Sequence, residues 1–450
     1  MAPAKAAART ISQQAFDEMV QENIDDLGLD PTEALEDAIQ TLTLQGVDLS
    51  GIVTCVPGES NPVMDCLGKL KEEEAFPEIK KLLDELSVLC GDKGLAAIAA
   101  KNGAVELVIS ICSKLRDERD RGLASGLNAM ASVLHDLQSS ERFKENGGPK
   151  IVVGILSNER EDEKILDGCF SVVAAAATGN EVLKESFIDL KIDELIVQIL
   201  KEHKGESIPS IYDAIRVILS SDDYRVVASQ VFGYARKFAK LGIAEVLVDS
   251  LREGLNTPCL ISASIALKVV AVNDEICRSI AYSGGIDVIL RCLDDSGLQG
   301  NSDVAKACCS LLSKLAGSDA NKSAIVEKGG MDRLVNLSAR FSDDPSVLQE
   351  VMSIICTLCL RSPENAARAI ESGAGDLAFQ AMQKFPESDL LQRNSCFMIR
   401  NLVVRNPENR KLLLGNGIED LIRRAKQSHK GCKAAATDAL RDLGVNNYNS

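Results

Sequence analysis

One short stretch of this 450-residue chain, Tyr282-Ser-Gly-Gly-Ile-Asp-Val-Ile-Leu290, returns three times downstream with the same pattern of polar and apolar residues. In each copy a glycine turn precedes an amphipathic helix, and the last glycines of the turns lie 45, 45 and 42 residues apart, at Gly285, Gly330, Gly375 and Gly417. The same slot recurs upstream at Gly103, Gly148, Lys191 and Gly242. A helical unit of this length cannot bury its apolar face alone, so the pattern predicts units that stack on their neighbours in a solenoid.

Each predicted unit contains a short first helix, the glycine turn, a second helix and a longer third helix. First helices begin clearly at Ser362-Pro363 and Asn406-Pro407, where a cap residue precedes a proline that suits the first turn. Lys191 replaces the glycine in the third unit, and we expect a different turn there. Three helices per unit favour an armadillo repeat over the two-helix HEAT form. We therefore predict an all-α, armadillo-type right-handed superhelical solenoid of about eight units over residues 91–444, followed by a tail at 445–450.

The chain before the array is acidic, with 18 acids against 6 bases between Met1 and Cys90. Residues 1–64 predict a helical head and a linker. One amphipathic helix runs from Ile11 to Leu27, and a second begins after Asp30, which can cap it, and ends near Gly46. We expect the linker to reach residue 64. The region 65–90 is predicted to hold a capping helix, which would shield the apolar end of the first unit.

Composition excludes several classes of function. A net charge of −16 disfavours general phosphate binding, because such binding needs an excess of Lys and Arg over a whole face. The 14 cysteines lie in apolar helical stretches and predict buried thiols in a reducing compartment, without disulfides. Three histidines lack a Ser or Cys nucleophile motif beside them, and no apolar run is long enough to cross a membrane.

Two local patterns resemble chemical motifs, and each has a simpler interpretation. Gly373-Ala-Gly-Asp-Leu-Ala378 matches the letters of a dinucleotide-binding turn, but it follows a predicted helix where a real one follows a strand. Cys356 and Cys359 share a helix face at a spacing suited to metal or redox chemistry, yet no second ligand pair accompanies them. We predict no cofactor, no metal site and no enzyme activity.

Two further segments leave alternatives open. Residues 221–240 lengthen the fourth unit and are interpreted either as a longer loop between helices or as an added contact surface. Between Leu391 and Lys433 there are 10 bases and 3 acids. These bases either solvate the last two units or form a surface that attracts acids, from a partner or from the acidic head.

The third helices are the expected binding surface, because they line the concave side of armadillo arrays. In proteins similar to importin alpha, this side repeats a Trp and, four residues later, an Asn that together hold a basic peptide. Here only Phe397 and Asn401 fit that pattern, so a nuclear transport adaptor of this type is disfavoured, as is also indicated by the acidic head. The residues predicted to bind protein, all on third helices, are Lys314, Thr357, Phe397, Arg400 and Asn401.

The chain resembles the armadillo repeat-containing protein 6 family over essentially its whole length. The N-terminal Gln45-Gly-Val-Asp-Leu-Ser-Gly-Ile-Val53 is the most distinctive part of the resemblance, and Asp222-Asp-Tyr-Arg-Val226 and Ile399-Arg-Asn-Leu-Val403 add to it. The family can carry histidines after Phe232-Gly233, where this chain has Tyr234 and Phe238, so no role of such histidines is transferred. The resemblance implies an armadillo scaffold and supplies no catalytic residue.

These observations favour a noncatalytic scaffold that binds a partner protein or an extended peptide along the concave face. A rigid, preformed groove suits this role because the array itself loses little conformational entropy on binding, and the flexible partner loses most of it. We expect a monomer in the cytoplasm, with the nucleus as a second compartment, that binds neither a small-molecule substrate nor nucleic acid nor a membrane.

Overall fold

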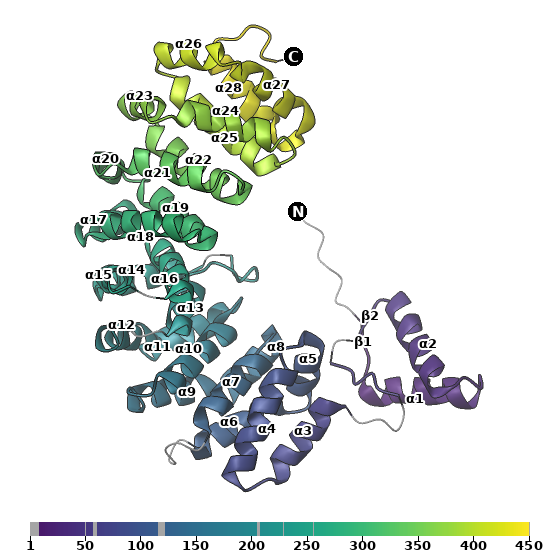
Figure 1. Cartoon of the computed structure of the whole chain (residues 1–450). Coiled ribbons are helices and arrows are strands. Elements are labelled where there is room, and N and C mark those ends of the chain that lie inside the picture. Colours follow the sequence, from purple (N-terminus) through teal and green to yellow (C-terminus); the bar gives the residue numbers. More distant parts are fainter. Residues whose placement is uncertain are drawn as a thin grey trace. The chain divides into compact units, whose positions relative to one another are not determined.

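The computed structural model describes residues 9–49, 51–56, 61–115, 122–204, 208–227, 229–254 and 256–449. Over these ranges the chain forms 28 α-helices, one 3-10 helix and a single pair of two-residue strands (Figure 1). Its contacts divide it into two units. The first unit contains Met1–Leu195 and Asp213–Val231, and the second contains Ile196–Tyr212 and Phe232–Ser450.

The head is a helical hairpin with its own small core. Helix α1 (Gln13–Asp25) packs on α2 (Pro31–Leu44), and the parallel strands β1 (Arg9–Thr10) and β2 (Val47–Asp48) flank them. Phe16 and Leu42 are among the residues buried between the helices. As predicted, Asp30 caps α2, because its carboxylate accepts the N–H groups of Thr32 (2.9 Å) and Glu33 (3.1 Å). The head is therefore folded by local apolar contacts and capping.

A pair of helices, α3 (Pro62–Glu72) and α4 (Phe76–Leu89), precedes the array. Helix α3 begins inside the region where we expected a linker. Its start is fixed by Asn61, whose side-chain oxygen accepts the N–H groups of Val63 (3.0 Å) and Met64 (3.4 Å), and by Pro62 in the first turn. The Asn-Pro pair therefore marks a helix start at this point, as it does later in the array.

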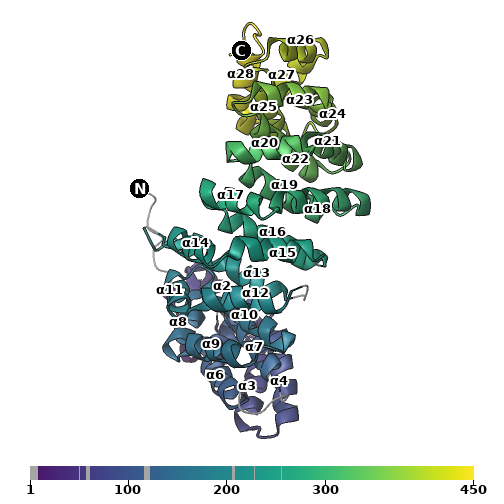
Figure 2. The ribbon, with the colours of Figure 1, turned by 90° about the vertical axis from the view of Figure 1, so that its left-hand side faces the viewer.

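From residue 93 onward the described helices follow one another as eight consecutive triplets. Their labels can be followed along the chain in Figures 1 and 2. The first four triplets are α5 (Lys93–Lys101), α6 (Ala104–Leu115), α7 (Leu123–Val133); α8 (Leu137–Glu145), α9 (Gly148–Asn158), α10 (Glu163–Ala177); α11 (Glu181–Asp189), α12 (Ile192–Glu202), α13 (Pro209–Ile218); and α14 (Val231–Lys240), α15 (Ile243–Arg252), α16 (Thr257–Val270). The next two are α17 (Asp274–Tyr282), α18 (Gly285–Gln299), α19 (Ser302–Leu315); and α20 (Asp319–Glu327), α21 (Gly330–Arg340), α22 (Pro345–Cys359). The last two are α23 (Pro363–Glu371), α24 (Ala374–Lys384), α25 (Asp389–Val403); and α26 (Pro407–Gly415), α27 (Ile418–Ser428), α28 (Lys433–Asp442), with the 3-10 helix η1 (Lys430–Cys432) before α28. The predicted all-α armadillo-type solenoid is confirmed.

The paired glycines of the repeat turn have two different roles. Gly329 has φ 75°, in the left-handed region, and connects the first helix to the second. Gly330 lies inside α21, where a Cβ atom would come within 2.6 Å of the backbone oxygen of Ile325. The first glycine therefore supplies the backbone conformation, and the second permits the close approach of the two helices.

The third turn contradicts our expectation of a different geometry. Lys191 adopts the left-handed conformation with φ 65°, and its N–H donates to the Ile188 carbonyl at 3.1 Å. Gly329 makes the equivalent bond to Val326 at 3.0 Å. The stacked helices on either side thus hold the same turn although a lysine there costs about 1–2 kcal/mol of backbone energy.

Residues 221–240 divide into a loop and the helix α14, which is the first helix of the fourth triplet. The loop is tied back to α11. The Asp222 carboxylate accepts the Gly179 N–H (3.1 Å) and pairs with Lys184, whose side chain is fully buried. Tyr234 and Phe238 of α14 are buried in the core. The longer loop is thus observed, and its role as a contact surface stays a hypothesis.

Buried asparagines link neighbouring repeats. The Asn321 side chain donates to the carbonyls of Cys277 (3.0 Å) and Leu315 (3.1 Å), which both belong to the preceding repeat. Asn409 repeats the arrangement with Ala366 (3.2 Å) and Leu402 (2.8 Å). Asn406 sits at the predicted helix start, but its amide bonds to Pro363 across the repeat boundary (2.8 Å) and makes no side-chain cap. Each such bond contributes about 1 kcal/mol and fixes the register of stacking.

Among the described residues, no single helix has the length and apolarity to cross a bilayer. Helices α5 and α6 meet that test only as a pair, and they are bent by 78° relative to each other.

Candidate functional site

The third helices of the second unit form a continuous row. Helices α16, α19, α22, α25 and α28 each pack on the next, and Figures 1 and 2 let the reader follow them along the array. We call the exposed and half-exposed side chains of these five helices the third-helix face. The five residues predicted to bind protein all lie on these helices, at Lys314 of α19, Thr357 of α22, and Phe397, Arg400 and Asn401 of α25.

Asn401 is held by the preceding repeat. Its side-chain nitrogen donates to the Cys356 carbonyl at 2.9 Å and lies 3.1 Å from the Cys356 sulfur. An asparagine that grips a peptide backbone needs a donor directed at that backbone. Here the amide instead joins α25 to α22, so its observed role is to connect two repeats.

Arg400 is held by the following repeat. Its guanidinium lies 3.1 Å from the Asp442 carboxylate and 3.4 Å from that of Asp438, both on α28. Arg441 pairs with the same two carboxylates. Charge at this end of the face is therefore largely compensated within the protein, and Arg400 joins α25 to α28.

Phe397 is half-buried and forms part of a pair that sequence reasoning missed. The Arg393 guanidinium lies over its ring, 5.4 Å from the centroid. The signal was present, since an Arg and an aromatic residue four positions apart meet on one helix face. The two side chains together offer a flat, partly exposed surface that combines a cation with an aromatic ring.

Lys314 and Thr357 occupy the middle of the face. Lys314 is exposed, whereas the Thr357 hydroxyl donates to the Ser353 carbonyl (2.9 Å) and lies 3.3 Å from the Ser313 hydroxyl of α19. A second lysine, Lys268 on α16, is also exposed and donates to the Ser310 hydroxyl at 2.6 Å. Sequence reasoning missed Lys268 because it lies between Ile265 and Val269, the positions on this helix that correspond to the Trp and Asn of importin-like proteins.

The basic residues near the C-terminus mostly hold the protein together. Arg423 pairs with Glu419 (2.8 Å) and donates to the Asn446 carbonyl (3.0 Å), and Lys426 donates to the Tyr448 carbonyl (2.6 Å). These bonds fasten the residues after α28 onto α27. The interpretation that these bases solvate the last two units therefore does not describe Arg423 and Lys426, which bind groups of the protein, and the acid-attracting surface stays a hypothesis.

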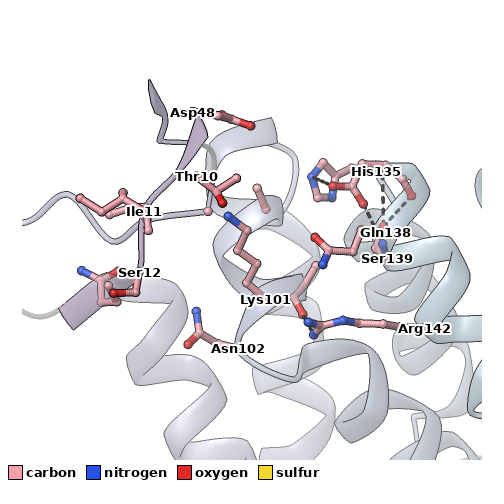
Figure 3. A pocket seen from close by; sticks show the side chains of 16 residues that line it. Thr10, Ile11, Ser12, Asp48, Lys101, Asn102, His135, Gln138, Ser139 and Arg142 are labelled. Carbon is pink, nitrogen blue, oxygen red and sulfur yellow. Dashed lines mark hydrogen bonds and ion pairs between the residues drawn. The ribbon is translucent and has the colours of Figure 1, made fainter. Parts of the chain in front are cut away.

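A hollow of about 570 Å³ lies between the head and the first two repeats (Figure 3). Its walls combine residues of the head near Thr10 and Asp48 with Lys101, the last residue of α5, and with Arg142 of α8. Several of its polar groups already have structural roles. Arg142 donates to the Ala100 carbonyl at 2.8 Å, and the Asp136 carboxylate caps α8 by accepting the Ser139 N–H at 2.7 Å.

His135 is the histidine in this hollow. Its Nδ1 lies 3.1 Å from the Val133 carbonyl and its Nε2 lies 3.4 Å from the Asp136 carboxylate. A general base needs a hydroxyl or thiol nucleophile within hydrogen-bond reach, and neither of these two contacts of His135 is with such a group. We therefore assign no chemistry to this hollow.

The thiols are buried, as the sequence predicts. All 14 cysteines are free, and 12 of them are buried, with Cys55 and Cys356 half-buried. Burial raises the pKa of Cys356 to about 11, an effect that the hydrogen bond from Asn401 opposes. Burial also raises the pKa of Cys359 well above its usual value. Both members of the Cys-x-x-Cys pattern are therefore protonated at neutral pH and poor metal ligands or nucleophiles.

Comparison with known proteins identifies relatives over most of the chain. The chain is 29% identical to human armadillo repeat-containing protein 6 over 394 residues, which cover 81% of this chain and 76% of that protein. It is 26% identical to the Drosophila melanogaster homologue over 381 residues, or 80% of this chain and 79% of that protein. The crystal structure of an engineered protein superposes with a TM-score of 0.56 at 18% identity, covering 86% of this chain and 99% of that one, and supports the fold alone.

The family itself is fixed by two models that together span nearly the whole sequence. The ARMC6 model matches residues 63–448, and the model of the armadillo repeat-containing protein 6 N-terminal domain matches residues 8–75. The second match covers the head, with its buried Phe16 and capped α2. The chain belongs to the armadillo repeat-containing protein 6 family.

Proposed function

We propose that this protein is a noncatalytic scaffold that binds an extended segment of a partner protein on the third-helix face between α16 and α28. The observation that carries the proposal is the uninterrupted packing of these five helices, which presents one polar and partly aromatic surface across five repeats. A surface of this kind is preformed. A flexible partner can therefore gain contacts from successive repeats without a rearrangement of the array.

Phe397 is the side chain on which we expect the binding energy to centre. Aromatic and arginine side chains dominate binding hot spots, and the Arg393–Phe397 pair supplies both from neighbouring turns of α25. Its half-exposed ring can be covered by a partner without disturbing the fold. Arg400 and Asn401 are better regarded as supports, since their charged and polar atoms are engaged by α28 and α22.

A peptide selection tests this proposal directly. Peptides of about 12 residues, selected from a random library on the intact protein, should bind the Phe397→Ala variant at least tenfold more weakly. The matched control is Leu298→Ala, which removes an exposed apolar side chain near the end of the second helix α18 and should leave the affinity unchanged. Equal affinity of all three proteins, or no selected peptide at all, would contradict binding on this face.

The importin-like alternative gains no support from the geometry. That mechanism requires repeated asparagines with free amides, whereas the single match, Asn401, donates to the Cys356 carbonyl. The expected compartment is a reducing one, the cytoplasm with the nucleus second, because 12 buried free thiols suit such an environment.

A further inference from the structure

The third-helix face carries three exposed cations that have no acidic partner. They are Lys268 on α16, Lys314 on α19 and Arg393 on α25. In the described ranges of the chain, no carboxylate lies within the 4.0 Å ion-pair distance of any of them. Lys268 donates to the Ser310 hydroxyl, and Arg393 lies over the Phe397 ring, so both are held in place without forming an ion pair.

Most acids of the same helices already have a partner within the protein. Asp303 pairs with Lys306 at 2.7 Å, Asp389 pairs with His429, and Arg400 and Arg441 hold Asp438 and Asp442. The remaining carboxyl group, Glu350, is half-buried. Burial raises its pKa, and the charges of Lys268 and Lys306 oppose that rise. The charge left for a partner on this face is therefore positive, although the chain as a whole carries −16.

Elsewhere in the same unit, several cations pair with carboxylates of a neighbouring repeat. Arg333 pairs with Asp294 at 2.7 Å, and Lys328, before α21, pairs with Asp287 of α18 at 2.7 Å. Arg368 of α23 pairs with Asp332 of α21 at 2.9 Å. These three ion pairs stabilise the contact between neighbouring repeats.

We propose that the third-helix face between α16 and α25 binds an acidic, extended segment of a partner protein, a partner class that rests on the proposed scaffold function. Carboxylates of the segment would pair with Lys268, Lys314 and Arg393, and an apolar side chain would cover the Phe397 ring. Charge complementarity of this kind accelerates association and rejects basic segments. The charge of the segment bound in this way is opposite to that of the basic nuclear signals held by an importin-like receptor.

Repeat spacing sets the spacing of the acids. Packed helices lie about 8–10 Å apart, and an extended chain rises about 3.3 Å per residue, so a segment crosses one repeat in about three residues. Lys268 and Lys314 lie on adjacent third helices, and Arg393 lies two third helices beyond Lys314. The predicted segment therefore carries acids about three and then about six residues apart.

The test uses the intact protein and a labelled peptide of about 12 residues with glutamates at this spacing, compared with peptides that have glutamine or lysine at the same positions. Fluorescence anisotropy should detect binding of the glutamate peptide at low salt. The affinity should fall at least tenfold between about 50 and 300 mM salt, because exposed charges are screened over about 10 Å. The glutamine and lysine peptides should bind at least tenfold more weakly.

Two variants of equal net charge separate the face from a general charge effect. Lys268→Glu with Lys314→Glu reverses two charges on the face and should weaken the glutamate peptide at least tenfold. Lys237→Glu with Lys240→Glu reverses two charges on the first helix α14 and should change the affinity less than twofold. Circular dichroism confirms that both variants keep the helical fold.

Each result decides the question. Equal loss in both double variants, or equal affinity for the glutamine peptide, overturns the acidic specificity. If library-selected peptides still depend on Phe397 in that case, the scaffold function survives and only the partner class is wrong. If neither the glutamate peptide nor any selected peptide depends on this face, the scaffold function fails as well.

Discussion

The buried ion pair between Lys184 and Asp222 offers the sharpest test of how the array is held together. Lys184 is 0% exposed, and its ammonium donates to the Ser220 carbonyl (2.6 Å) and pairs with the Asp222 carboxylate. Asp222→Ala would leave this ammonium buried, with the Ser220 carbonyl as its hydrogen-bond acceptor. Breaking a buried pair in this way costs about 3–5 kcal/mol. Because the Asp222 side chain is 32% exposed and water can replace part of the carboxylate, we expect the lower end, about 3 kcal/mol.

The effect should be local, because repeat arrays unfold in parts. Hydrogen exchange read by mass spectrometry measures this opening separately for α11 and for other helices. A loss of about 3 kcal/mol corresponds to about 100-fold faster exchange in α11, while α22 in the other unit should be unchanged. Lys184→Met removes the buried charge and keeps an unbranched chain. Added to Asp222→Ala, it should restore about 1–2 kcal/mol, because no charge is then stranded.

A matched control lies at the same position of the sixth triplet. Lys322 is the fourth residue of α20, as Lys184 is of α11, and it pairs with Asp319 at 3.0 Å and donates to the Leu360 carbonyl at 3.1 Å. The Asp319 side chain is 89% exposed, so Asp319→Ala should cost less than about 1 kcal/mol. The reasoning is refuted if Asp222→Ala lowers the opening free energy of α11 no more than the control lowers that of α20. It is also refuted if the loss in the double variant equals the sum of the losses in the two single variants, because the buried pair is then not coupled.

Four further outcomes are expected. Lys191→Gly should stabilise the third repeat by about 1 kcal/mol in hydrogen exchange, since glycine adopts the left-handed turn without strain; a loss of stability would assign more weight to the lysine side chain. Hydrogen bonds from the Arg225 guanidinium and then from the Glu181 N–H hold the pKa of Asp223 well below its usual value of 3.8. The Asp223 carboxylate therefore stabilises the loop fully above pH 3.8, and this stabilisation is lost as the pH falls through the lowered pKa. Asp223→Asn should remove this pH dependence of hydrogen exchange at residues 219–227. Phe16→Ala should cost the head about 3 kcal/mol in exchange of α1 and α2, with α22 unaffected. A thiol reagent at pH 8 should modify the half-buried Cys55 before Cys112, whose pKa is raised by burial to about 12; faster reaction of Cys112 would mean that the repeat opens frequently.

The period and the helix caps made the fold predictable from sequence. Each repeat packs only on its neighbours, so a sequence pattern that recurs at a fixed interval is enough to predict how the repeats are arranged. Asp30 and Ser362 cap helices where the sequence indicates, because capping depends on residues within one turn. The prediction of a different turn at Lys191, which rested on the same local reasoning, was wrong. Lys191 adopts the same left-handed turn as the glycines of the other repeats, so the repeat geometry overrides local propensity at this position.

The candidate site was less predictable, because its residues act across repeat boundaries. Phe397 could be picked out from its position on a third helix, and Lys314 likewise. The engagement of Asn401 by Cys356, 45 residues earlier, and of Arg400 by Asp442, 42 residues later, depends on the alignment of neighbouring helices to within an ångström or so. Sequence identifies such side chains as polar and outward-facing, but it does not distinguish a side chain that binds a partner from one that joins two repeats.

Basic residues on a repeat protein also divide into those that join repeats and those that can attract a partner. The segment from Leu391 to Lys433 has the densest excess of bases, yet its Arg400, Arg423 and Lys426 are bound to acids or carbonyls of the same protein. Lys268 and Lys314 stand in unremarkable stretches of sequence and carry no acidic partner within the described ranges. A partner is attracted by the charge that remains after internal pairing. The field of a paired cation is largely cancelled by the opposite charge of its neighbouring carboxylate. A surface that attracts acids therefore arises where stacking leaves cations unpaired, and on this chain that condition is met along α16, α19 and α25.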